Sequence, residues 1–367
     1  MSVFKQFKSN IMKRDLEMLP LFAQFIRDTR TGKRTKVSGQ KIAPQTIRNY
    51  EQVLKLLKSF SISQGIILRI KTLLSANDRK RVGECRYWRR FYMKFSDYLY
   101  DEKKCFDNYV GLVMRVVKAF FNYLRCDKLL LTGDFFEKFY SPTEEIEIIT
   151  LLPGQLRFLI TDKDFESRLS FRLKITKDIF VFGCTVALRC SDLFAVKCKD
   201  IKKQGRKAYL SMLSKKTGKL TTVRLPGYLL ETVNKFTSHK QASSFVFPRV
   251  SLERFNKNIK HICELAGWCQ VCPKIRYRRG EAIEQLANKK LVQYRFCDRV
   301  STHVMRRTAI TTMVTLGMPE NLVRTISGHS PNSKEFYRYV NYAQGYMDRE
   351  VNRVYQKLLR NGAGTSE

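Results

Sequence analysis

Apolar residues recur at helical spacing through the first 140 residues of the chain. From Met18 to Arg30, and again from Ile47 to Phe60, they fall three or four positions apart, which predicts amphipathic helices. The same spacing returns from Tyr87 to Leu99 and from Val110 to Leu124. We therefore expect residues 1–140 to form a helical domain.

The aromatic residues of the third segment mark its buried face. Their spacing places them on one stripe, which is more typical of a protein core than of a surface that stacks on bases. The basic residues between them form either an ordinary solvated face or a face that follows DNA phosphates, and the large excess of lysine and arginine favours the second. The aromatic residues are Tyr87, Trp88, Phe91, Tyr92 and Phe95, and the basic residues are Arg86, Arg89, Arg90 and Lys94.

The pattern changes where these helical segments end. Pro142 and the acidic pair Glu144-Glu145 interrupt the basic helices, which is typical of a linker. We expect a linker at 141–152, a second domain at 153–360 and a disordered tail at 361–367.

The second domain is predicted to consist of helices around a small β section. Two alternating segments joined by the basic turn at 215–218 predict a β-hairpin. Thr302 is a candidate cap for one late helix, and glycines follow that helix and the next. The expected helices are 153–160, 168–188, 228–236, 251–265, 302–316, 319–328 and 351–359, and the expected strands are 207–214, 219–226 and a second hairpin within 274–286. The fold class is therefore mainly α with a small β component: a helical N-terminal domain followed by an α+β domain.

The net charge of the chain limits the kinds of molecule that it is expected to bind. Lysine and arginine number 69 against 33 acidic residues, which gives a formal charge of +36. A polyanion offsets such a charge, and each neutralised phosphate releases counterions. Nucleic acid is therefore the expected partner, with an anionic membrane surface second. No apolar run reaches the roughly 18–20 residues of a spanning helix, and the N-terminus lacks the pattern of a secretory signal. We expect a cytoplasmic, nucleoid-associated protein.

The ten cysteines are too sparse for a disulfide scaffold and predict reduced thiols. Cys269 and Cys272 have the spacing of metal ligands, with His261 and Cys263 upstream. A structural zinc site usually needs two such pairs, so we expect free thiols here. The sequence has no glycine-rich phosphate loop and no carboxylate cluster for Mg²⁺. We expect no cofactor and no metal.

Basic and hydroxyl-bearing side chains gather near the C-terminus. His303 and Arg306 lie one helical turn apart, His329 follows a glycine, and several tyrosines come soon after. A phosphodiester is anionic, and its transition state gathers further negative charge that guanidinium groups bind bidentately. Cations beside a phenol therefore indicate chemistry on a phosphodiester, with the phenol as the nucleophile.

Five short segments, taken in chain order, resemble the tyrosine recombinase family, also called the phage-integrase-like superfamily, and most nearly the integrases of mobile elements. The family pattern is Arg, Lys, His-x-x-Arg, Gly-His/Trp and Tyr. Each segment is unspecific alone, but their order on so basic a chain is a strong combined signal. The segments are ALRCSDL (187–193), KKTGK (215–219), THVMRR (302–307), SGHS (327–330) and FYRYV (336–340).

The resemblance covers about residues 150–360. It extends more loosely to residues 1–140, which are similar to the family's helical DNA core-binding domain, and it makes 153–360 the catalytic domain. It also implies a role for each matching residue. Arg189 and Arg306 match the two arginines, Lys216 the hairpin lysine (with Lys215 and Lys219 as alternatives), His303 and His329 the two histidine positions, and Asp192 an acidic residue that braces the site. A salt bridge to Asp192 or a neighbour would also explain an arginine at position 189.

Three tyrosines are candidates for the nucleophile. Many relatives carry the tyrosine nine residues beyond the second histidine, where this chain has Arg338. Relatives also often have an aromatic residue three positions before the nucleophile, and Phe336 lies three before Tyr339. We expect Tyr339 to be the nucleophile, with Tyr337 and then Tyr342 as alternatives.

The resemblance implies a site-specific DNA recombinase. Such an enzyme cleaves and rejoins strands through a 3′-phosphotyrosyl intermediate and a Holliday junction. The partners it implies are double-stranded DNA attachment sites and further copies of the chain, which form a homo-tetramer in the synaptic complex. A DNA-bending accessory protein is a further possible partner. Two alternatives share the fold or the constellation: a type IB topoisomerase, and a DNA-binding regulator that no longer cuts. The complete residue set argues against the regulator, and the ALRCSDL context argues against the topoisomerase.

Overall fold

The chain folds as two units. The structure, a computed structural model, describes residues 15–73, 78–215, 218, 220–287, 292–343, 348 and 351–356. The first unit holds the described residues up to Ile146 together with 275–283, and the second holds those of 147–274 and from 284 onward. Residues 351–356 are helical, whereas 357–359 of the expected last helix and the expected tail at 361–367 lie outside the described residues.

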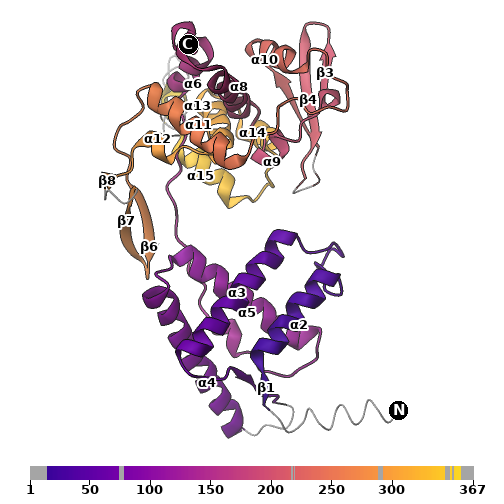
Figure 1. Ribbon diagram of the computed structural model, residues 1–367, viewed down its shortest axis with the longest axis vertical. Coiled ribbons are helices and arrows are strands. Elements are labelled where there is room, and N and C mark those ends of the chain that lie inside the picture. The colour runs from indigo at the N-terminus through magenta and orange to yellow at the C-terminus, as the bar shows by residue number, and fades with distance from the viewer. Residues whose placement is uncertain are drawn as a thin grey trace, which may run out of the picture. The chain divides into compact units, whose positions relative to one another are not determined.

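The helices of the first unit form where the apolar spacing predicts them (Figure 1). Helices α2, α3 and α5 pack against one another, and a short antiparallel strand pair brings the residues before α2 beside those after α3, with Leu16 opposite Ile70. The elements are β1 (Leu16–Glu17), α2 (Met18–Thr31), α3 (Pro44–Ser63), β2 (Arg69–Ile70), α4 (Asp78–Asp97), a π-helical turn (Tyr98–Glu102), α5 (Asp107–Cys126) and a 3-10 turn (Phe135–Lys138). Helix α4 begins nine residues before the expected segment.

Aromatic rings fill the core of this unit. Trp88 is buried and stacks on Phe135 with ring centroids 4.9 Å apart, while Phe121 meets it edge-on at 4.7 Å. Of the predicted stripe, Trp88, Phe91 and Phe95 are buried, and Tyr87 and Tyr92 are partly buried. The prediction of a core stripe is therefore confirmed. The basic side chains on the other face of α4 are exposed: Arg86, Arg89, Arg90 and Lys94.

Helices dominate the second unit, and α8 is its central helix (Figure 1). The second half of α8, from Ile179 to Val186, is apolar and buried on nearly all sides, which is typical of a helix within a core. The helices are α6 (Pro153–Thr161), α7 (Lys163–Arg168), α8 (Phe171–Val186), α9 (Cys190–Leu193), α10 (Gly227–Thr237), α11 (Leu252–Leu265), α12 (Phe296–Arg299), α13 (Thr302–Thr315), α14 (Glu320–Ser327) and α15 (Lys334–Tyr342), with a 3-10 turn at Cys198–Asp200. Among the described residues of both units, every helix is too short or too polar to span a membrane.

The chain from 201 to 293 also forms two small antiparallel sheets, of which the first lies wholly in the second unit. The first has the order β3–β4–β5, and its predicted hairpin pairs Leu213 with Leu220. The second has the order β6–β7–β8, and its predicted turn lies at Arg279-Gly280. The strands are β3 (Ile201–Gln204), β4 (Lys207–Leu213), β5 (Leu220–Leu225), β6 (Lys274–Arg278), β7 (Glu281–Ala287) and β8 (Val292–Gln293). Strands β3 and β8 were not expected from the sequence.

Helices α8 and α13 approach closely because Gly183 has no side chain. A Cβ at Gly183 would collide with the sulfur of Met305, which is fully buried. Met305 is the neighbour of Arg306 on α13. The contact therefore sets how closely the segment that carries His303 and Arg306 lies to α8.

Three helix boundaries differ from the sequence expectation. Ser301, rather than Thr302, is at the N-cap of α13, and its side chain makes no capping hydrogen bond. The expected helix over 168–188 is α8 at Phe171–Val186, capped by Ser170, and a short helix that was not expected, α7 at Lys163–Arg168, precedes it and is capped by Asp162. Helix α15 was not expected, since its aromatic and basic residues lack a long apolar period; Ser333 caps it.

Replacing Gly183 by alanine should destabilise the second unit. The added methyl group forces Met305 to move in a close-packed core, which typically costs about 1–3 kcal/mol. Gly154→Ala is the matched control, because a Cβ there meets no atom within 4 Å and alanine favours the helix by up to about 1 kcal/mol. Denaturant unfolding of both variants measures the difference. Equal midpoints would contradict the close-approach argument.

Candidate active site

Arg306 is held by two neutral acceptors. Its Nη1 donates to the carbonyl of Ala187 at 2.8 Å, and its Nη2 lies 3.1 Å from Nε2 of His329. Ala187 ends α8 in the left-handed conformation, with φ of 56°. The guanidinium is thereby fixed between the end of α8 and the residue that follows α14.

Arg189 is oriented through a hydroxyl group. Its Nη1 donates to Ser214 Oγ at 3.1 Å, and Ser214 Oγ donates to Asp192 Oδ2 at 3.0 Å. Asp192 is buried and also accepts from the backbone N–H of Lys215 at 3.2 Å. One carboxylate therefore ties the end of β4 to α9 and, through Ser214, holds Arg189. Among the described residues, no direct ion pair joins Arg189 to Asp192.

His329 is a neutral acceptor. Arg306 Nη2 lies 3.1 Å from Nε2 and 3.3 Å from Nδ1 of the ring, and Ser327 Oγ lies 2.7 Å from Nδ1. Because Ser327 donates its own proton elsewhere, we assign the ring proton to Nδ1 and the acceptor role to Nε2. Ser327 in turn donates to the carbonyl of Arg324 at 3.3 Å. Burial, reinforced by repulsion from Arg306 and other arginines, lowers the pKa of His329 to about 3. The imidazole is therefore uncharged near neutral pH and orients Arg306.

A pocket of about 740 Å³ opens beside these residues. Burial first, and repulsion from Arg189 second, lower the pKa of Arg306 to about 10, so the group remains charged at neutral pH. The pocket's lining is rich in cations and includes Arg189, His303, Arg306, Arg307, Arg338 and Tyr339. Such a lining suits an anion, because like charges held together are relieved by an opposite one.

His303 lines the pocket with an exposed side chain. Lys216 and its alternative Lys219 lie outside the described residues. The other alternative, Lys215, is exposed, and its backbone N–H is the group bound by Asp192.

The two leading tyrosine candidates have different surroundings. Tyr339 lines the pocket, and its ring centroid lies 6.0 Å from that of His329. The Tyr337 hydroxyl accepts from Arg324 Nη2 at 3.2 Å, and the residue does not line this pocket. The side chain of Tyr342 lies outside the described residues.

Three pocket or support residues were not found from the sequence. Ser214 and Ser327 act through other residues, and serines are too common for their positions to signal such a role. Glu335 lines the pocket one helical turn before Tyr339, and its charge raises the pKa of Arg306 against the effect of burial. The sequence offered one signal for Glu335: it lies four residues before Tyr339, which places the two residues on the same face of a helix.

The cysteines of the candidate zinc segment lie near one another without forming a metal site. Cys269 Sγ is 3.8 Å from Cys297 Sγ, and burial raises the pKa of Cys263 and of Cys297. Within the described part of the chain, no group of three or more His, Cys, Asp or Glu side chains is arranged to hold a metal ion.

Solved structures share this fold at low sequence identity. A lambda integrase dimer bound to a COC′ core site is 12% identical with a TM-score of 0.56, covering 93% of this chain and 81% of that one. The Tn1549 transposon integrase in complex with transposon right end DNA is 14% identical with a TM-score of 0.56, covering 93% and 100%. The XerH site-specific recombinase bound to palindromic difH substrate is 12% identical with a TM-score of 0.50, covering 91% and 94%.

The family comparison covers the part of the chain that builds the pocket. Residues 163–344, from α7 through α15, match the model of the phage integrase family. A comparison with curated proteins gives no significant match. Residues 163–344 therefore form a phage integrase domain, the domain of tyrosine-type site-specific recombinases.

Proposed function

We propose that the protein recombines DNA by forming a covalent bond between Tyr339 and a DNA 3′ phosphate. The observation that carries this proposal is that Tyr339 lines the same pocket as Arg189, Arg306 and His303. The two guanidinium groups bind the non-bridging oxygens of the scissile phosphate, and each such donor commonly contributes about 10²–10³ in rate. Tyr337 is less suited, because Arg324 already binds its hydroxyl.

The proposed step balances in bonds and protons. The Tyr339 oxygen attacks phosphorus and loses its proton, while the bond from phosphorus to the 5′ oxygen breaks. The departing oxygen takes a proton, for which Lys216 on the hairpin is the proposed donor. The product is a 3′-phosphotyrosyl ester and a free 5′ hydroxyl. Because the ester conserves the bond energy, a 5′ hydroxyl from another strand can reverse the step, and strand exchange proceeds through a Holliday junction.

The phenol proton is proposed to go to His303 rather than to His329. Arg306 occupies Nε2 of His329, and Nδ1 carries the proton that Ser327 binds. The lowered pKa makes His329 a poor base, so its proposed role is to position Arg306. His303 lines the pocket with an exposed imidazole, and this position supports its proposed role.

The partners we propose are duplex attachment sites and other copies of the chain. The exposed basic face of α4 (Arg86, Arg89, Arg90 and Lys94) suits a phosphate backbone and gives no base specificity. Helical residues 351–356 expose Val351, Val354 and Tyr355, which suits docking on a neighbouring protomer of a synaptic tetramer. A DNA-bending accessory protein and association with the nucleoid follow as further expectations of this role.

The nucleophile is tested with a nicked attachment-site duplex. We expect wild-type protein to form a DNA adduct that survives SDS, and Tyr339→Phe to lower its yield on the order of 10³-fold or more, because no other phenol replaces the lost one. Tyr337→Phe is the matched control and should retain the adduct.

The outcomes of this experiment separate the alternatives. An adduct in Tyr339→Phe would overturn the assignment of the nucleophile. Binding with steep salt dependence and no adduct in the wild type would favour the non-cutting regulator. Relaxation of supercoiled plasmid that lacks any attachment site would favour the type IB topoisomerase.

Ser214→Ala should slow cleavage without weakening DNA binding to the same degree. The variant removes the hydroxyl between Arg189 and Asp192, and misplacing a catalytic group commonly costs about 10- to 100-fold in rate. Ser211→Ala is the control, because the Ser211 hydroxyl hydrogen-bonds with Thr222 on the same sheet. Single-turnover cleavage and DNA affinity are measured for both. Equal cleavage rates would contradict the positioning role of Ser214.

His329→Gln should make stability less sensitive to acid. The folded pKa of His329, about 3, lies below the ordinary value near 6.5, so the unfolded chain binds a proton first as pH falls. The folded state therefore has this group's full contribution above about pH 6.5 and loses it toward pH 3. Glutamine retains an acceptor for Arg306 but does not titrate.

The effect is measured by denaturant unfolding at pH 7.5 and pH 5. Between these values the wild type should lose on the order of 1 kcal/mol more than His329→Gln, after allowance for partial solvent exposure. An equal loss in both proteins would show that the imidazole is not held neutral.

A further inference from the structure

The tip of the second hairpin belongs to the first unit, although it lies within the second unit in sequence. Residues 275–283, which include most of β6 and the start of β7, pack with the described residues up to Ile146. The chain therefore passes between the units at three places: after residue 146, after 274 and after 283. The proposed reaction gives no role to this hairpin.

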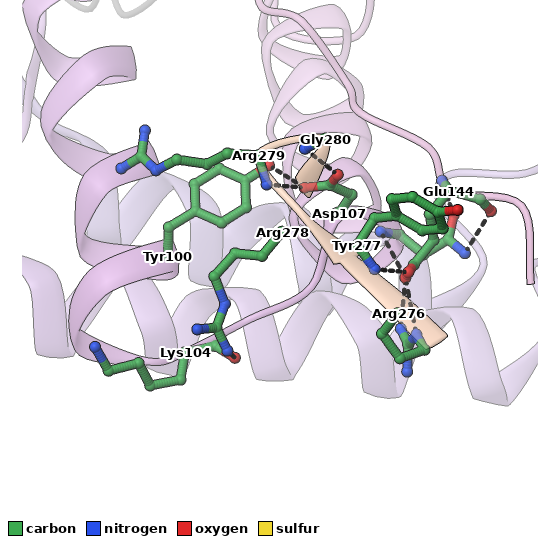
Figure 2. A network of polar contacts seen from close by, with 10 residues as sticks. Tyr100, Lys104, Asp107, Glu144, Arg276, Tyr277, Arg278, Arg279 and Gly280 are labelled. Carbon is green, nitrogen blue, oxygen red and sulfur yellow. Dashed lines mark hydrogen bonds and ion pairs between the residues drawn. The ribbon is translucent and has the colours of Figure 1, made fainter. Parts of the chain in front are cut away.

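Glu144 binds the hairpin close to one of these passages. Its side chain is fully shielded from solvent, and its Oε1 accepts from Arg276 Nη2 at 2.6 Å and Nε at 3.1 Å. Its Oε2 accepts from the backbone N–H of Tyr277 at 2.6 Å. Burial alone would raise the pKa of Glu144, but the hydrogen bonds from Arg276 and Tyr277 outweigh it and lower the pKa. The carboxylate is thus a charged anchor (Figure 2).

The same residue also anchors the linker to α5. Asn108 Nδ2 donates to the carbonyl of Glu144 at 3.0 Å, and the Glu144 N–H donates to Asn108 Oδ1 at 3.1 Å. A Cβ at Gly111, one turn further along α5, would collide with the carbonyl of Pro142. The linker therefore lies directly against the helix backbone, three residues before the second unit begins at Glu147.

Asp107 anchors the turn of the hairpin. Its Oδ1 accepts from the backbone N–H of Arg279 at 2.8 Å, and its Oδ2 accepts from that of Gly280 at 2.9 Å. Both turn residues have positive φ, 55° and 81°, so their two N–H groups point the same way and form an anion-binding nest. Figure 2 shows this nest facing Asp107. The Arg279 side chain adds ion pairs to Asp97 and Asp101.

We propose that Glu144 and Asp107 form a clasp that pins the three passages of the chain to the start of α5. Only short segments separate the clasp from the second unit. Glu144 lies three residues before Glu147, where that unit begins, and Arg276 lies two residues after Lys274, where the chain leaves it. Such a pinned connection limits the orientations that the units can sample. If both units bind one duplex, as the proposed function requires, the clasp lowers the conformational entropy lost on binding. Its consequence is tighter binding to DNA that contacts both units, with no new contact to DNA.

Glu144→Gln tests the clasp, with Glu147→Gln as the matched control. Glu147 lies in the same segment but pairs with Arg299 within the second unit. Hydrogen exchange of the full-length protein without DNA should show residues 275–283 exchanging about tenfold faster in Glu144→Gln, with α2, α8 and Glu147→Gln unchanged. Unchanged exchange at 275–283 would overturn the clasp.

A second variant guards against misfolding of the first. If α2 and α3 also exchange faster in Glu144→Gln, that variant has disturbed the whole first unit. Arg276→Gln then replaces it, because it removes the partner of Glu144 on the hairpin. The clasp requires that exchange in Arg276→Gln be faster at 275–283 alone. The affinity for a duplex long enough to contact both units should fall about tenfold or more in the clasp variants and less than about twofold in Glu147→Gln. Equal affinities would overturn the role in DNA binding.

The outcome is separable from that of the proposed function. If the wild-type protein forms no SDS-resistant adduct, the covalent mechanism is contradicted. The exchange and affinity measurements do not depend on the adduct, so they still test the clasp. An adduct in the wild type together with unchanged exchange in both clasp variants would contradict the clasp alone.

Discussion

The site depends on two arginines, Arg189 and Arg306, that repel each other and that form no direct ion pair with a carboxylate among the described residues. Arg306 is bound by a backbone carbonyl and a neutral imidazole, and Arg189 is bound by a hydroxyl. The repulsion is visible in the lowered pKa of Arg306, to which burial and Arg189 both contribute. Neutral acceptors orient the two cations, and the carboxylates of Asp192 and Glu335 offset only part of the burial and repulsion that lower the pKa of Arg306. An anion that enters the pocket is therefore bound by groups that need little rearrangement, as a developing phosphorane charge requires.

The scaffold supplies this arrangement through backbone geometry as much as through side chains. Gly183 allows α13 to lie close to α8, and the left-handed turn at Ala187 presents the carbonyl that holds Arg306. Asp192 joins α9 to the end of β4 through Ser214 and Lys215. Each contact joins elements far apart in sequence. A change in helix packing would therefore shift the positions of Arg189 and Arg306 even when neither residue is mutated.

The sequence predicted the elements better than the contacts between them. Apolar period identified the helices that begin near Met18, Pro44 and Gly227, because those patterns are local and strong. The family order of Arg189, His303, Arg306, His329 and Tyr339 named residues that the fold places in or beside one pocket. The sequence did not predict that Ser214 orients Arg189 or that His329 is neutral, because both depend on neighbours far away in the sequence. It also gave no sign that residues 275–283 pack with the first unit, since a hairpin's turn chemistry does not specify its docking partner.

Peptide mapping of the covalent DNA adduct tests the central claim most directly. Trypsin cleaves after Lys334, Arg338 and Arg349, so it separates Tyr337 from Tyr339 into different peptides. After nuclease trimming, mass spectrometry should locate the residual nucleotide on the peptide of residues 339–349, and fragmentation should place it on Tyr339. A nucleotide on the peptide of residues 335–338, on Tyr342 or on a residue outside the pocket would contradict the account.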